Sequence, residues 1–388
     1  MRRALQGLLL ALLFLLPVAA LAQQGQDITA QCRILMPGTR GARAKAFDRK
    51  HRTRWNQWGP RSARIEVQLP RGVTSGGLYL CFAVEPALLE VYADGDPEPL
   101  HRQEGESYAH RYLPFEGAGT LRIELTGTRD GVSLAELYVF SGAEPPAWVQ
   151  RWQPQLTKAD LLLVAAHPDD ELLWFGGAIP TYAIQRGKAV AVAYMTCANP
   201  LRRSEMLDGL WTAGVRHYPF IGRFPDENVG TIKAQTALWG GEEAVQGHLT
   251  ALYRQLKPQV VLSHDLQGEY GHPAHILTAR AAVAALAAAA DAGQDPRSAG
   301  EYGVWEVPKL YLHLYPEGTL EMDWTQPLAA ADGQTSLQLS KEAFQHHRSQ
   351  KQRWKVSVDG PHSAARFGLV RSLVGEDMRK DDFFENIP

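Results

Sequence analysis

Cysteine is scarce in this chain, which has three, Cys32, Cys81 and Cys197, among 388 residues. So few thiols exclude the disulfide-rich class of small secreted domains, and a chain of this length can bury a core without disulfide or metal cross-links. Cys32 and Cys81 both lie in the N-terminal third and could form one bridge, which would leave Cys197 unpaired. The alternative is three free thiols, most of them buried, and the sequence leaves both possibilities open.

An excess of charge of either sign is also absent, because Lys and Arg total 40 against 42 Asp and Glu, a formal net charge of −2. A chain without a basic excess has no overall electrostatic attraction to nucleic acid or to an anionic membrane, so we expect neither partner. Hydrophobic residues make up 45% and charged residues 21%, which excludes disorder, collagen and coiled coil. The length suggests two or three globular domains.

The hydrophobic run at the N-terminus is too short for a membrane span. It extends from Leu8 to Leu16, nine residues, whereas a spanning helix needs roughly 20. It follows the basic Arg2 and Arg3 and precedes Ala20-Leu21-Ala22, a small-residue cleavage site. This order is typical of a secretory signal peptide, so we expect residues 1–22 to be removed and the protein to be exported, to a periplasm or outside the cell. After cleavage we expect no stable membrane span.

Two kinds of pattern divide the rest of the chain. Between residues 23 and 145, apolar and polar residues alternate in short segments separated by Gly, Pro and Asp, which predicts an antiparallel β-sandwich. From 146 to 388, apolar strands alternate with helical stretches, which predicts the α/β class, a Rossmann-like doubly wound parallel sheet. Ligands of such sheets bind beyond the carboxyl ends of the strands, so functional residues are expected at that edge.

Histidines and acids gather after two of the predicted buried strands. His167, Asp169 and Asp170 directly follow the first apolar strand of the predicted sheet, and His272 and His275 follow a later one. Two imidazoles and a carboxylate that leave room for water are the usual ligand set of a catalytic zinc site. The alternative is that these residues only cap the helices that begin at both turns. Two such clusters at neighbouring strand ends favour the metal site.

Two segments carry a family resemblance: AHPDDE at 166–171 and GHPAH at 271–275. They resemble the paired motifs of the PIG-L/LmbE family of zinc-dependent N-acetylglucosamine deacetylases. Arg202-x-x-Glu205 and the segment 341–350, which ends in His-Arg-Ser-Gln, resemble two further motifs of that family. The resemblance covers about residues 158–355 and implies the PIG-L deacetylase fold for the C-terminal part.

The resemblance also implies roles for the clustered residues. His167, Asp170 and His275 would bind one Zn²⁺ per chain, although Fe²⁺ or Co²⁺ could occupy the same ligands. Asp169 would be the general base that deprotonates the attacking water, and His272 the general acid or the donor to the tetrahedral oxyanion. No serine nucleophile is then needed, and the G-x-S-x-G elbow is absent from the sequence.

Four further residues are expected near the substrate. Arg202 and Asp226 resemble family positions that contact sugar hydroxyls, although Arg202 could instead pair locally with Glu205. His264 and Asp265 are expected to line or buttress the site without binding the metal.

The chain departs from the family pattern at two places. The family often has an acid inside the second motif, where this chain has Ala274. Such an acid would favour the protonated form of His272, and Asp265 or Glu269 could take its place. Cys197 follows Thr196 at a place where relatives usually carry a Thr followed by Asp-Gly or similar. It could therefore line the pocket, but a buried structural thiol is the favoured interpretation.

The N-terminal part resembles discoidin-like, galactose-binding sandwiches, through Phe47-Asp48, Thr53-Arg54-Trp55 and the segment 135–139. This resemblance implies a carbohydrate-binding module over 23–145. The segment 40–54 carries seven Lys or Arg against one acid, and it could recognise an anionic glycan or simply be a solvated face.

These observations predict an exported hydrolase that removes an acetyl group from an N-acetylglucosamine-containing glycan or glycoconjugate. One alternative is a non-catalytic carbohydrate-binding protein on a deacetylase fold. Another is a zinc amidase for a different N-acyl substrate, since pocket-lining loops set that choice. The sequence predicts no oligomeric state.

Overall fold

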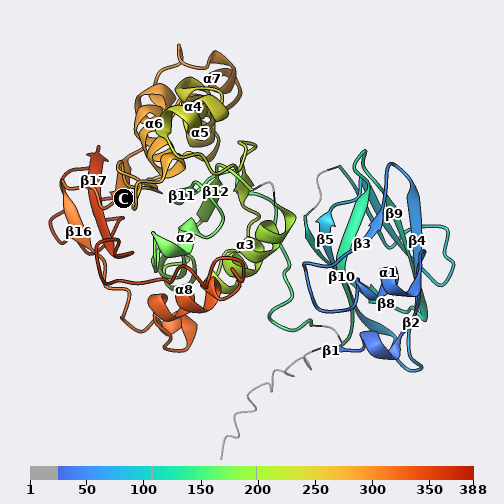
Figure 1. The fold of residues 1–388 in the computed structure, drawn as a ribbon. Helices are drawn as coiled ribbons and strands as arrows, with labels where there is room; N and C mark the ends of the chain where they lie inside the picture. Colours follow the sequence, from blue (N-terminus) through green and yellow to red (C-terminus); the bar gives the residue numbers. More distant parts are fainter. Residues whose placement is uncertain (1–24, 106–107, 143, 198) are drawn as a thin grey trace, which may run out of the picture.

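The computed structural model describes residues 25–105, 108–142, 144–197 and 199–388. The predicted signal peptide, residues 1–22, lies outside the described residues. Figure 1 shows two parts: a β-sandwich, coloured from blue to green, and a larger α/β part, coloured from green to red.

Two antiparallel sheets form the sandwich, as the alternating pattern predicts. The first has the order β1-β10-β5-β8, with β3 also paired to β10, and the second has the order β2-β4-β9-β6-β7. Along β4, Ala63, Ile65 and Val67 are buried in the core between the sheets, whereas Arg64 between them is exposed. The strands are β1 Gln26–Asp27, β2 Arg33–Leu35, β3 Trp55–Gln57, β4 Ser62–Gln68, β5 Ser75–Val84, β6 Leu88–Ala93, β7 His101–Glu104, β8 His110–Glu116, β9 Thr120–Thr126 and β10 Val132–Ser141, with the helix α1 Arg40–Ala44.

A seven-stranded sheet organises the α/β part, in the order β13-β12-β11-β14-β15-β17-β16. The first five strands are parallel, and β17 and β16 add an antiparallel edge. The predicted doubly wound parallel sheet is therefore confirmed for the centre. The strands are β11 Leu161–Ala165, β12 Val190–Tyr194, β13 Phe220–Ile221, β14 Val260–Ser263, β15 Lys309–His313, β16 Thr319–Glu321 and β17 Arg366–Ser372.

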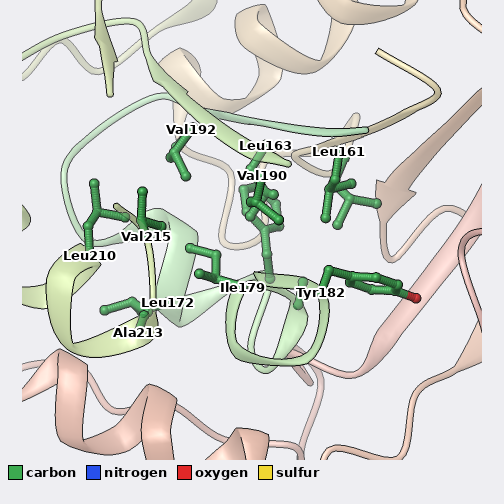
Figure 2. Close-up of a cluster of buried hydrophobic side chains, with 14 of the residues drawn as sticks. Leu161, Leu163, Leu172, Ile179, Tyr182, Val190, Val192, Leu210, Ala213 and Val215 are labelled. Carbon is green, nitrogen blue, oxygen red and sulfur yellow. The ribbon is translucent and has the colours of Figure 1, made fainter. Parts of the chain in front are cut away.

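Helices cover both faces of this sheet, which explains why its central strands are continuous apolar runs. Leu161 and Leu163 of β11 point into one hydrophobic core, packed against α2 and α3 (Figure 2), and Leu162 and Val164 point into the other, packed against α5 and α6. The helices are α2 Asp170–Leu173, α3 Pro200–Ala213, α4 Ile232–Leu238, α5 Glu242–Leu256, α6 Pro273–Ala290, α7 Pro296–Tyr302 and α8 Ser336–Phe344.

Helix α6 is the one helix among the described residues that is long and apolar enough to cross a membrane. Its apolar character has a simpler cause, because 72% of the apolar stretch is buried inside the protein. The alanines along it, including Ala282 and Ala285, pack against α5 and the sheet in the second core. We therefore interpret α6 as a core helix.

All three cysteines are free. The Cys32 thiol donates to the carbonyl of Ile28 at 3.4 Å, and Cys81 lies buried beside His110 on the opposite face of the first sheet. Cys197 is buried in the core, where burial raises its pKa to about 12. Of the two possibilities for cysteine, the structure therefore has three thiols, and Cys197 is the buried structural thiol.

Candidate active site

A polar cavity of about 400 Å³ opens at the carboxyl ends of β11 and β14. This is the edge at which a doubly wound sheet binds its ligands. Its walls come from the turn after β11, the start of α3, the loop after β13, the turn before α6 and the segment after α8. The lining residues are His167, Asp169, Asp170, Leu173, Trp174, Arg202, Asp226, Glu227, Asn228, Tyr270, His272, Gln350, Arg353 and Trp354.

The turn after β11 aims two adjacent carboxylates into this cavity. Asp169 has a φ of 115°, a left-handed conformation that side chains rarely adopt, and α2 begins at the next residue. The Asp170 carboxylate is fixed on both oxygens: the backbone N–H of His167 donates to Oδ2 at 2.7 Å, and the indole N–H of Trp174 donates to Oδ1 at 2.8 Å. Burial disfavours the charged form of Asp170, but His275 and His264 outweigh it and hold its pKa well below the usual value.

Three histidines surround Asp170. His167 Nδ1 lies 3.3 Å from Oδ2, His275 Nε2 lies 3.3 Å from Oδ1, and His264 Nε2 lies 3.4 Å from Oδ2. Among the described residues, two triads have possible metal-ligand atoms within 4.8 Å of one another: His167, His272 and His275, and also Asp170, His264 and His275. His275 belongs to both.

Hydrogen bonds decide which of these groups are free to bind a cation. His275 Nε2 is buried and has no hydrogen-bond partner among the described residues. His264 Nε2, in contrast, accepts the backbone N–H of Ala166 at 2.9 Å, and its Nδ1 faces Glu269 at 3.1 Å. Both nitrogens of His264 are therefore occupied, and it buttresses the site from behind. His167, Asp170 and His275 are the set that fits a divalent metal, since a buried orphaned imidazole nitrogen facing a carboxylate is a typical metal-ligand arrangement.

Glu269 is a buried acid that organises the histidines. Its Oε2 lies 2.6 Å from His275 Nδ1, and its Oε1 lies 3.1 Å from both His264 Nδ1 and His313 Nδ1. Burial disfavours its charged form, but His264 and His275 hold its pKa well below the usual value. A carboxylate on Nδ1 of His275 fixes the tautomer in which Nε2 is free to bind a metal. Glu269 thus contacts His275 and not His272, the partner that the sequence suggested for it.

Asp169 lies beside this set and has a different environment. Burial and the neighbouring charge of Asp170 raise its pKa to about 8, against the opposing effect of Arg202. Arg202 Nη2 donates to Asp169 Oδ1 at 3.3 Å and to the carbonyl of Pro168 at 2.5 Å. Its Nη1 lies 3.6 Å from Asp226, so the pair predicted to contact substrate does meet in the cavity.

The alternative pairing of Arg202 with Glu205 is wrong. The carboxylate of Glu205 instead accepts the backbone N–H and the hydroxyl of Ser349, at 3.1 and 2.5 Å. The motif Arg202-x-x-Glu205 and the segment 341–350 are therefore hydrogen-bonded to each other. This contact holds the segment after α8 next to the cavity.

His272 is the N-cap of α6, at the mouth of the cavity. Its Nδ1 accepts the backbone N–H of Ala274 at 3.3 Å, which leaves Nε2 as the nitrogen that carries a hydrogen. Burial and the adjacent His275 and His167 lower its pKa to about 3. Asp265, the other predicted lining residue, instead caps its own turn by accepting the N–H of Gln267 at 3.0 Å.

Sequence reasoning missed an aromatic wall of the cavity, formed by Trp174, Tyr270 and Trp354. The ring centroids of Tyr270 and Trp354 lie 4.9 Å apart, and those of Trp174 and Trp354 lie 5.6 Å apart. Tyr270 is 46% exposed, so part of the wall is open to a ligand. Trp174 and Tyr270 lie close in sequence to the two histidine motifs, and this proximity was the signal that could have placed them at the cavity.

Comparisons with known proteins identify the family of the C-terminal part. Residues 162–286 match the PIG-L family, described as GlcNAc-PI de-N-acetylase. The 1D-myo-inositol 2-acetamido-2-deoxy-alpha-D-glucopyranoside deacetylase of Streptomyces avermitilis is 31% identical over 201 residues, 45% of this chain and 67% of that protein.

Solved structures resemble each part of the chain. N,N'-diacetylchitobiose deacetylase from Pyrococcus horikoshii covers 53% of this chain and 76% of its own, with 18% identity and a TM-score of 0.37. The F5/8 type C domain of a Bacteroides fragilis protein covers 31% of this chain and 96% of its own, with 17% identity and a TM-score of 0.25. The sequence identity and the family match, and not these distant structural likenesses, establish that the chain belongs to the PIG-L family of deacetylases.

Proposed function

We propose that this protein is an exported, metal-dependent deacetylase that hydrolyses the acetamide of an N-acetylglucosamine-containing glycan or glycoconjugate. One observation carries the proposal: the orphaned Nε2 of His275 faces Asp170 and His167 in a cavity that also holds Asp169. The curated relative from Streptomyces avermitilis is named for an acetamido-glucopyranoside, and the family model for a GlcNAc de-N-acetylase.

His167, Asp170 and His275 would hold the metal, with Zn²⁺ as the first candidate and Fe²⁺ or Co²⁺ as alternatives. When bound, such an ion polarises the amide carbonyl and lowers the pKa of water. Asp170 is prepared for this role because its carboxylate is buried, charged and fixed by Trp174 and the backbone of His167.

Asp169 acts as the general base. It takes a proton from the attacking water, whose oxygen then bonds to the carbonyl carbon. Its contact with Arg202 keeps the carboxylate directed into the cavity. A buried carboxyl group with a raised pKa can both accept this proton and return it to the departing amine.

His272 donates a hydrogen bond to the oxyanion that forms from the carbonyl oxygen. Because Nδ1 accepts the N–H of Ala274, the hydrogen of the neutral ring is on Nε2. This arrangement favours the donor role over that of an imidazolium acid, and it needs no acid at position 274.

The cavity around this chemistry fits an amino sugar. Trp354 and Tyr270 offer ring faces for an apolar sugar surface, and Arg202 and Asp226 offer polar contacts for hydroxyl groups. We propose the division of the chain into a signal peptide at 1–22, a carbohydrate-binding sandwich at 23–145 and the deacetylase domain at 146–388.

Acetate release by the metal-loaded protein tests the proposal, with an N-acetylglucosamine glycoside and chitooligosaccharides as substrates. We expect release that disappears in the Asp169→Asn variant. If metal is bound and no acetate appears from any amino sugar, the protein either acts on another N-acyl substrate or only binds carbohydrate, and the proposal is wrong.

A further inference from the structure

A second cavity, of about 310 Å³, lies where the sandwich meets the α/β part; we call it the junction cavity. On one side it is lined by the outer face of the first sandwich sheet, with Tyr79 of β5 and Tyr138 of β10. On the other side are Asp208 and Trp211 of α3 and, after α8, Arg348. The proposed reaction uses none of these residues.

Trp148, in the segment that connects the two parts, forms an aromatic platform at this cavity. Its ring packs edge to face on Tyr138, Phe140 and Tyr79, at centroid distances of 5.1, 5.7 and 5.8 Å. The supporting rings are buried, yet Trp148 itself is 50% exposed. A large ring that is held rigidly and left open on one side can stack on a sugar face with little loss of side-chain entropy.

Two arginines, Arg49 and Arg348, line the same cavity as Trp148. The Arg49 guanidinium lies 3.8 Å from the centroid of the Tyr138 ring and is also paired with Asp27 at 2.7 Å. Arg348 is exposed and belongs to a segment, 343–358, that contains no Asp or Glu. On the sandwich side, Arg49 belongs to the segment 40–54 with its seven Lys or Arg. The acid in the cavity wall, Asp208, accepts a hydrogen bond from Gln150 at 2.6 Å.

The junction cavity and the polar cavity of the candidate active site, which we call the catalytic cavity, are lined by two elements in common. Arg348 lines the junction cavity and Gln350 the catalytic one, so these positions are at most about 7 Å apart along the backbone. Along α3, Arg202 lines the catalytic cavity and Asp208 the junction cavity, a separation of roughly 9 Å on a helix. The exposed cations Lys351 and Arg353 continue the same basic segment.

We propose that the junction cavity is a second glycan subsite, and that it binds an acidic amino-sugar polymer whose acetylated unit lies in the catalytic cavity. Trp148 stacks on a sugar of the same chain, and Arg348 binds a carboxylate on it. This inference rests on the proposed function for the identity of the polymer, because the deacetylase site fixes which sugar carries the reacting group.

Three variants of the full chain test the subsite: Trp148→Ala, Trp148→Phe and Arg348→Glu. The exposed Arg71, in the turn after β4, gives the matched charge control, Arg71→Glu. Substrates are a monomeric N-acetylglucosamine glycoside, chitohexaose as the neutral oligomer and a hyaluronan hexasaccharide as the acidic oligomer. We expect Trp148→Ala and Arg348→Glu to raise KM for the acidic hexasaccharide roughly 5- to 10-fold. Trp148→Phe keeps an aromatic ring, so its KM for the acidic hexasaccharide should stay close to that of the parent. Turnover of the monomer should not change in any of the three variants.

Binding of the hexasaccharides to the same variants in an Asp169→Asn background separates this inference from the proposed function, because calorimetry needs no turnover. Weaker binding of the acidic hexasaccharide in Arg348→Glu, with Arg71→Glu unchanged, supports the subsite even if no acetate is released. Equal losses of binding for the neutral and the acidic hexasaccharide in Arg348→Glu would contradict the proposal that the polymer is acidic. Binding that is insensitive to both Trp148→Ala and Arg348→Glu would overturn the subsite while leaving a deacetylase intact.

Discussion

Asp169 and Asp170 are neighbours in the chain, but their surroundings give them opposite protonation behaviour. Asp170 faces His275 and His264, and these hold its pKa well below the usual value despite burial. Burial and the charge of Asp170 raise the pKa of Asp169 to about 8. Two acids whose pKa values are pushed apart can serve different roles. In the proposed function these are a metal ligand for Asp170 and the general base for Asp169.

The substitution Asp169→Asn tests the proposed role of Asp169 as general base. Asparagine keeps the size of the side chain and a contact for Arg202 but cannot take a proton. We expect turnover to fall by about 10²- to 10⁴-fold with the metal content unchanged. Metal analysis and acetate release on the same preparation check this, and full activity in the variant would contradict the assignment of Asp169.

The substitution Glu269→Gln tests whether Glu269 supports His275 as the proposed metal ligand. The amide can present its N–H₂ group to His275 Nδ1 and permit the wrong tautomer, so metal affinity should fall by about 10- to 100-fold. Competition with a chelator measures this affinity. Circular dichroism shows whether the variant is folded, and Glu243→Gln, on the exposed side of α5, should leave the affinity unchanged.

Strand β15 carries a buried lysine, which ties the C-terminal segment to the sheet. The ammonium of Lys309 contacts the carboxylate of Asp377 and donates to the carbonyl of Glu385 at 2.8 Å. The hydroxyl of Tyr311, on the same face of β15, also donates to Asp377. Because both charges are buried, each depends on the other for compensation.

Removing one partner of this pair should be costly. Asp377→Asn leaves the buried charge of Lys309 unpaired, and we expect a loss of about 3–5 kcal/mol in the free energy of unfolding. The pair of Arg379 and Asp381 is exposed on both sides, at 65% and 67%, so Asp381→Asn should have little effect. Urea denaturation of both variants distinguishes them, and equal stabilities would show that the buried pair is dispensable.

Strand β8 places a histidine where it cannot be charged. Burial lowers the pKa of His110 from 6.5 to about 3, and its Nδ1 faces the Tyr79 hydroxyl at 2.6 Å. Below the unfolded pKa, the unfolded chain binds a proton that the folded chain does not bind. The stability contributed by neutral His110 is therefore present above pH 6.5 and is lost as the pH falls toward 3.

From about pH 7.5 to about pH 5.5, this single group should cost about 1.4 kcal/mol of unfolding free energy. The measurement is urea denaturation of the parent and of His110→Asn at both pH values. The parent should lose more stability on acidification than the variant by that amount. An identical pH dependence in the two proteins would mean that His110 is charged in the folded state.

On the scale of the whole molecule, α3 joins the two parts. Arg203 pairs with Glu85 at 2.9 Å and donates to the carbonyl of Ala83 at 3.1 Å, and the next residue, Ser204, contacts His51 at 2.8 Å. Ala109 of the sandwich is buried in the same hydrophobic core as β11. Helix α3, which begins at the catalytic cavity, therefore also contacts the sandwich.

The substitution Arg203→Ala should loosen this junction. It removes one partly buried ion pair and one hydrogen bond to a carbonyl, together worth about 1–3 kcal/mol. We expect faster cleavage by a protease in the connecting segment 145–150, with Arg71→Ala cleaved at the parent rate. An unchanged cleavage rate would show that the two parts are held by the apolar contacts alone.

Local patterns in the sequence determined the two folds and the ligand candidates. Alternation in β4 predicted a sandwich face, and the unbroken run of β11 predicted a strand covered on both sides, because side-chain periodicity reports burial directly. The histidine and acid motifs follow strand ends, so their meeting at one edge was predictable from the direction of the strands. The predictions for the signal peptide and export rest on the sequence alone.

Only the tertiary structure decided how those residues are used. Glu269 holds His275, Glu205 binds Ser349, and Trp354 meets Tyr270, all through contacts between segments whose spacing in the chain says nothing of their distance in space. The same holds for the junction cavity, whose walls come from both parts. Periodicity shows which residues are buried, but hydrogen-bond partners and cavity walls depend on how distant elements pack.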